Sequence, residues 1–131
     1  MALDDQLRAR IEAVLRGLPP RTGLAEAERE RLIAFYRDRL VHRAKIVLSE
    51  VRLVPPPGLR KAGVRGASTL AHHLLMDELC DAYRALTGRP PTRSEKHGGY
   101  GVFARDVHAA ARLKMALDHA IQRACEANQS R

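Results

Sequence analysis

The residues best suited to binding chemistry lie in a glycine-containing segment that leads into a helical apolar pattern near residue 102. Glycines ahead of a helix let an anion approach the backbone, and the free N–H groups of the first turn carry partial positive charge. The segment therefore predicts a phosphate or carboxylate site, although it lacks a P-loop pattern and solvated turn glycines explain the same residues. The expected site residues are Arg89, Arg93, Lys96, His97, Gly98, Gly99, Tyr100 and Arg105.

Two further groups of bases accompany this segment. A ridge of bases is predicted on the last helix, opposite its apolar stripe, and it could follow a phosphate backbone. Its members are Arg105, His108, Arg112, His119 and Arg123. A Pro/Gly-containing stretch carries Arg60, Lys61 and Arg65, which could become ordered on nucleic acid. A solvated helix face and a plain connector are the alternative interpretations.

The net charge of +8 is unevenly distributed along the chain. Residues 52–66 hold four bases and no acid, and residues 84–112 hold six bases and two acids. These two stretches account for the whole excess, so the rest of the chain is balanced. Concentrated positive charge attracts phosphates, anionic lipids or acidic proteins.

Metal binding and catalysis find little support in the sequence. His72 and His73 precede Asp77, but no HExxH motif completes a metal site, and His72 falls on an apolar helix face where a core histidine is expected. Cys80 and Cys125 belong to no zinc-type spacing and are expected to be buried free thiols, with a disulfide between their helices as the alternative. With no GxSxG motif either, no catalytic residue, metal ligand or cofactor is predicted.

Four amphipathic helices are expected to position these residues. Apolar residues recur with helical spacing over residues 3–18, 25–53, 69–86 and 102–127, with Gly and Pro between the segments. Lys114 interrupts the last stripe, where it is expected to snorkel or pair one turn later. The prediction is one all-α domain over residues 1–131, a compact bundle of about four helices with two long basic Pro/Gly-containing loops.

The composition is that of an ordinary globular domain, with 45% hydrophobic and 29% charged residues. No apolar run is long enough to span a membrane, and the acidic start does not resemble a secretory signal, so a cytoplasmic location and no membrane partner are expected. Phe35, His42 and Ile46 fall outside the apolar stripe of their helix. They are expected to meet another helix of the chain or a second copy of it.

These features favour a nucleic-acid-binding or nucleoprotein-associated regulatory protein that contacts mainly phosphate, DNA included. The alternative is a protein-interaction bundle, homodimeric or bound to an acidic partner. A ligand-binding role for the glycine segment is the third hypothesis, and an enzyme is less favoured than any of them.

Overall fold

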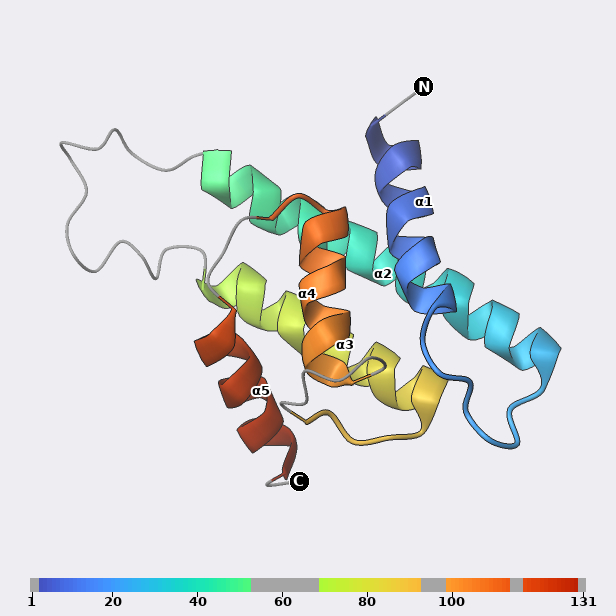
Figure 1. The fold of residues 1–131 in the computed structure, drawn as a ribbon. Coiled ribbons are helices and arrows are strands. Elements are labelled where there is room, and N and C mark those ends of the chain that lie inside the picture. Colours follow the sequence, from blue (N-terminus) through green and yellow to red (C-terminus); the bar gives the residue numbers. More distant parts are fainter. Residues whose placement is uncertain (1–2, 53–68, 93–98, 114–116, 130–131) are drawn as a thin grey trace, which may run out of the picture.

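The computed structural model describes residues 3–52, 69–92, 99–113 and 117–129, and all regular secondary structure in those ranges is helical (Figure 1). The described helices are α1 (Leu3–Arg16), α2 (Glu26–Arg52), α3 (Thr69–Thr87), α4 (Tyr100–Ala110) and α5 (Asp118–Gln129). The predicted all-α class is confirmed. None of the described helices is long and apolar enough to cross a membrane.

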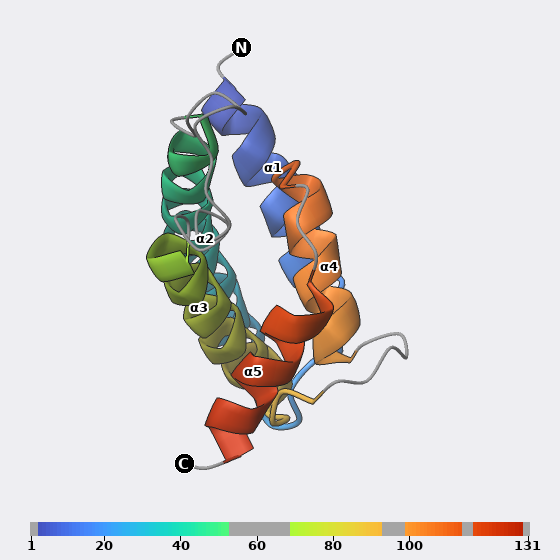
Figure 2. The ribbon, with the colours of Figure 1, turned by 90° about the vertical axis from the view of Figure 1, so that its left-hand side faces the viewer.

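The helices form two layers (Figure 2). The layer formed by α2 and α3 faces the layer formed by α1 and α4, and the neighbours within each layer run in opposite directions (Figures 1 and 2). Across the layers, α1 packs on α2 and α4 packs on α3, while α5 packs against α3. The buried apolar residues therefore form one continuous core between the two layers.

Apolar spacing along α1 and α2 accounts for their packing. In α1, Leu7, Ile11 and Leu15 recur every four residues and all are buried. The buried stripe of α2 includes Ile33 and Leu40, and α2 contacts both α1 and α3. The long helix therefore packs against two neighbours.

Helix α3 is the most enclosed element among those described, because α2, α4 and α5 all pack on it. Its apolar residues Leu75, Leu79 and Leu86 are buried, and so are His72, as expected, and the carboxylate of Glu78. The helix ends at Thr87, and Gly88 follows with φ +69° while its N–H donates to the carbonyl of Arg84 at 2.8 Å. Gly88 therefore terminates the helix in the left-handed conformation that glycine adopts without steric cost.

The prediction of one helix over residues 102–127 is wrong, because that stretch forms α4 and α5. Helix α4 ends in a Schellman arrangement, in which the N–H of Leu113 donates to the carbonyl of His108 at 2.8 Å and that of Arg112 donates to Ala109 at 3.1 Å. Arg112 occupies the left-handed position with φ +58°, where glycine is usual. No Gly or Pro marks this break, which is why residue type alone did not reveal it.

Candidate functional site

The predicted anion site at the start of the last helix is only partly described, since Arg93, Lys96, His97 and Gly98 lie outside the described residues. Gly99 is the N-cap of α4, with extended backbone (φ −81°, ψ 162°) and no capping side-chain hydrogen bond. Tyr100 and Gly101 follow it and are buried. The first side chain of the helix therefore points inward, away from the predicted anion site.

Tyr100 is a core residue. Its side chain is fully buried, and its ring packs edge-on against Tyr83 with centroids 5.7 Å apart. Burial raises the pKa of its hydroxyl, and the neighbouring Cys80 thiol acts in the same direction. A ring in this position is not available to stack on a nucleobase.

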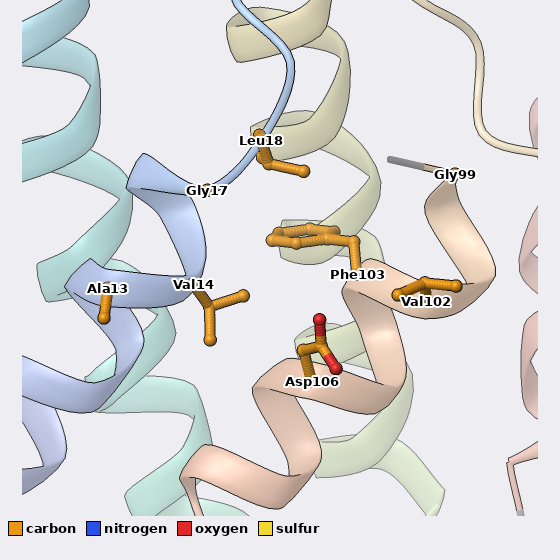
Figure 3. Close-up of a pocket in the computed structure, with 8 residues that line it drawn as sticks. All are labelled: Ala13, Val14, Gly17, Leu18, Gly99, Val102, Phe103 and Asp106. Atoms are coloured by element: carbon orange, nitrogen blue, oxygen red, sulfur yellow. The ribbon is translucent and has the colours of Figure 1, made fainter. Parts of the chain in front are cut away.

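A small pocket of about 290 Å³ lies beside Gly99, between α1 and α4 (Figure 3). Val14 and Leu18 from the α1 side face Phe103 across it, and Asp106 is the single charged residue of its lining. An apolar pocket with a carboxylate at its edge disfavours an anion. The described part of the predicted phosphate cradle is therefore a poor match to phosphate.

The predicted basic ridge does not form, because the helix that would have carried it is broken and one of its members is internal. His108 is 1% exposed. Arg105 is turned toward Asp118 at the start of α5, with which it forms an ion pair. Arg112 is exposed at the end of α4, whereas His119 and Arg123 are exposed on α5.

The two basic segments of the sequence leave α3 at its opposite ends. Arg60, Lys61 and Arg65 precede α3 in the chain and lie outside the described residues. Arg89 follows its other end, is exposed, and donates its backbone N–H to the Thr87 hydroxyl at 3.1 Å. A helix of 19 residues is about 28 Å long at 1.5 Å per residue, so the segments do not share a point of attachment.

A buried histidine pair joins α3 to α4. The Nε2 atoms of His72 and His108 are 2.9 Å apart, and His108 Nδ1 lies 2.7 Å from the carbonyl oxygen of Ala104. Because a carbonyl only accepts, His108 Nδ1 carries the hydrogen and its Nε2 is the acceptor for His72 Nε2–H. The sequence placed His72 in the core correctly, but His108 was assigned to a surface ridge.

Both imidazoles are held neutral by their surroundings. Burial lowers the pKa of His72 to about 4, with smaller contributions from His108, His73 and Arg123. Burial also lowers the pKa of His108, against the opposing effect of its bond to Ala104. The pair is a neutral hydrogen-bonded contact at pH 7, and no described group of three or more potential ligands surrounds it or lies elsewhere in the described structure.

A larger pocket, of about 610 Å³, lies where the first turns of α1, the last turns of α2 and the end of α4 meet. We refer to it as the α1–α2–α4 pocket. Leu7, Leu48 and Ala111 contribute apolar wall, while Arg10 and Arg112 contribute guanidinium groups. Lys45 also lines it and is paired with Asp4, with Nζ and Oδ2 2.8 Å apart. The sequence could not reveal this pocket, because its walls come from three separate helices.

The three residues predicted to lie at an interface, Phe35, His42 and Ile46, differ in exposure. Ile46 is half-buried and packs against the core, which is the intramolecular contact expected as one alternative. Phe35 is 52% exposed, and its ring lies 5.4 Å from the guanidinium carbon of Arg39. His42 is exposed on the same helix.

Most described bases of α1 and α2 are engaged within the chain. Bases of α1 and α2 pair across their contact, as in Arg16–Glu30 and Arg37–Glu12, both at 2.7 Å. The buried carboxylate of Glu78 on α3 receives Arg39 and, at 3.7 Å, Arg43. The helical framework therefore neutralises itself, in agreement with the charge balance of the sequence.

No described arrangement suggests covalent catalysis. Cys80 and Cys125 are free and buried, as predicted, and burial raises the pKa of the Cys80 thiol. A protonated, enclosed thiol is a poor nucleophile. Comparison with protein-family models, with curated protein sequences and with solved structures finds no match to this chain, so its function is argued from its own residues.

Proposed function

We propose that this protein binds nucleic acid, mainly through phosphate, using the bases of its two connecting segments. The observation that carries the proposal is the division of charge. Acids of the framework are taken up by ion pairs within the chain, as for Glu12, Asp38 and Glu78, whereas the excess of +8 belongs to residues 52–66 and 84–112. Within those stretches Arg105 pairs with Asp118, and Arg84 also has a partner in the chain. The bases proposed to release counterions from a phosphate backbone are therefore those between the helices: Arg60, Lys61, Arg65, Arg89, Arg93 and Lys96.

The attachment of the segments determines the kind of contact proposed. Their origins at the two ends of α3 are about 28 Å apart. This argues against one helix inserted into one groove and favours contacts spread along the nucleic acid. Since Tyr100 is internal, stacking on bases has no part in the proposal. Binding should then depend on salt and show little sequence preference.

A salt titration with a labelled random-sequence duplex tests the proposal by fluorescence polarisation. The test variant carries Arg60→Gln, Lys61→Gln and Arg65→Gln. Loss of three phosphate contacts should lower the slope of log K against log salt by about 2.7. The matched control carries Arg8→Gln, Arg16→Gln and Arg31→Gln, which remove the same charge from exposed bases that pair within the chain.

Two results would overturn the proposal. The first is an affinity of the unaltered protein that hardly changes between low and moderate salt. The second is an equal loss of slope in the control, because that would show a response to net charge alone and not to the connecting segment.

Exposure of Phe35 favours a second candidate, a protein-interaction role for one face of α2. Phe35, Arg39 and His42 follow one another at helical spacing, and an exposed aromatic ring covered by an arginine is a common interface feature. The expected partner is a second copy of the chain. Sedimentation equilibrium should show a dimer that Phe35→Ser dissociates, and a monomer at high concentration removes this candidate.

A further inference from the structure

We propose that the α1–α2–α4 pocket binds a small amphipathic anion, with a carboxylate head and an aliphatic tail. This inference goes beyond nucleic-acid binding and does not depend on it, because it uses the interior of a pocket and not the connecting segments. The pocket's volume of about 610 Å³ lies within the range of small-molecule sites, roughly 300–1,000 Å³.

The apolar part of the pocket accounts for the tail. Leu7 is nearly buried, Leu48 is half-buried, and Ala111 is 3% exposed. These residues belong to α1, α2 and the end of α4, so the wall extends over three elements. No aromatic side chain is present among the residues that line it, and a nucleobase would find no stacking partner there. An aliphatic chain, in contrast, needs only apolar surface removed from water.

The charges at the pocket account for the head group. Arg10 lines it from α1 and Arg112 from the turn after α4, and neither has an ion-pair partner among the described side chains. Lys45 adds a third base and is compensated by Asp4. The described lining therefore carries two uncompensated guanidinium groups, and a guanidinium binds a carboxylate through two parallel hydrogen bonds.

The backbone of Arg112 is a second, independent indication. Its φ of +58° lies in the left-handed region, which L side chains rarely adopt and which glycine would occupy without steric cost. The chain nevertheless places an arginine there, beside the apolar wall formed by Leu7, Leu48 and Ala111. Strained positions of this kind concentrate at binding sites, where the position of a side chain matters more than local stability.

Isothermal titration calorimetry with decanoate, below its micelle concentration, tests the proposal. Decyltrimethylammonium carries the same tail with the opposite charge, and acetate carries the same head without the tail. Decanoate should bind with one site per chain. The other two should bind at least about tenfold more weakly, since each lacks one half of the recognition.

Variants then assign the site. Arg112→Gly removes the guanidinium while relieving the backbone strain, so a lost affinity cannot be due to unfolding. Arg10→Gln removes the other one, and both should weaken decanoate binding about tenfold. Arg31→Gln is the control, because Arg31 is exposed, pairs with Glu28 and does not line the pocket.

Equal binding of decanoate and decyltrimethylammonium would overturn the proposal, and so would unchanged affinity in Arg112→Gly and Arg10→Gln. Absence of decanoate binding would overturn it as well. None of these results affects the salt titration on duplex, in which the Arg60, Lys61 and Arg65 variant is the readout, so the two proposals fail separately.

Discussion

The contact between α1 and α2 and the contact between α3 and α4 manage polar groups in opposite ways. The first places charged pairs at the surface, such as Arg16–Glu30 and Lys45–Asp4, at 2.7 and 2.8 Å. The second buries two uncharged imidazoles, His72 and His108, in contact with each other at 2.9 Å. The polar groups of the first interface are charged and exposed to water, and those of the second are uncharged and buried.

This difference determines which conditions each contact tolerates. Exposed ion pairs are individually weak and are screened by salt, so the loss of one leaves the packed apolar residues of α1 and α2 in place. A buried imidazole that gains a proton must lose either its hydrogen bond or its apolar surroundings. The α3–α4 contact should be sensitive to pH, and the α1–α2 contact should tolerate both pH and single substitutions.

The largest expected effect is a loss of stability in mild acid. The pKa of His72 is about 4 in the folded protein, and an unfolded histidine titrates near 6.5. The unfolded state therefore binds more protons as pH falls from 6.5 toward 4, and the free energy of unfolding decreases through that window. We expect a loss of about 1–2 kcal/mol between pH 6.5 and 5, measured by urea denaturation.

Two variants separate this effect from other titrations. The double substitution His72→Leu and His108→Leu should flatten the pH profile between 6.5 and 5, whereas His42→Gln, at an exposed histidine, should leave it unchanged. Glu12 and Glu30 have lowered pKa values through their arginine partners, so their contribution is lost only below about 4.5. A steep profile that persists in the double variant would contradict the role of the pair.

The sequence revealed the α1–α2 contact better than the α3–α4 contact, for a physical reason. Apolar residues four apart, as in Leu7, Ile11 and Leu15, determine which side of a helix is buried before its neighbours are known. The burial of His108 depends on α4 turning a particular face toward α3. On the continuous helix predicted over residues 102–127, His108 falls opposite the apolar stripe, whereas on the shorter α4 it is buried.

The break after α4 explains most of the other errors. Arg112 is an unusual left-handed residue, and the Schellman bonds that stabilise the turn are made by backbone atoms that any sequence possesses. The sequence contained one sign of this break. Lys114, which lies outside the described residues, falls in the apolar stripe that a continuous helix would have. The α1–α2–α4 pocket follows from the break, and no reading of single helices could have located it.

Glu78 is intermediate between the exposed ion pairs and the buried imidazoles, because its buried carboxylate pairs with partly exposed arginines. It is 6% exposed on α3, and Arg39 and Arg43 of α2 approach it. Glu78→Gln keeps the shape and removes the charge, and we expect it to lower the free energy of unfolding by about 1–2 kcal/mol. Urea denaturation would measure this, with Asp77→Asn, an exposed acid on the same helix, as the control. Equal losses in the two variants would mean that burial adds nothing to this contact.

Arg112→Gly should stabilise the protein. Glycine adopts φ +58° without the steric cost that an arginine meets, although it restores some entropy to the unfolded chain. We expect a gain of about 0.5–1 kcal/mol by urea denaturation. Arg112→Gln, which removes the charge and keeps the side chain, should show no such gain. A gain of the same size in both would assign the effect to charge and not to backbone conformation.

The smallest effect is expected at the surface of the α1–α2 contact. Arg8 and Asp38 are both about half exposed, and their nearest charged atoms are 3.4 Å apart. Arg8→Gln should change the free energy of unfolding by less than about 0.5 kcal/mol, and any difference should shrink at high salt because the Debye length falls to about 3 Å at 1 M. Urea denaturation at low and high salt would measure both. A loss as large as that of Glu78→Gln would break the contrast between surface and buried polar contacts, because it would show that a screened surface pair holds α1 on α2 as firmly as a buried carboxylate holds α3 on α2.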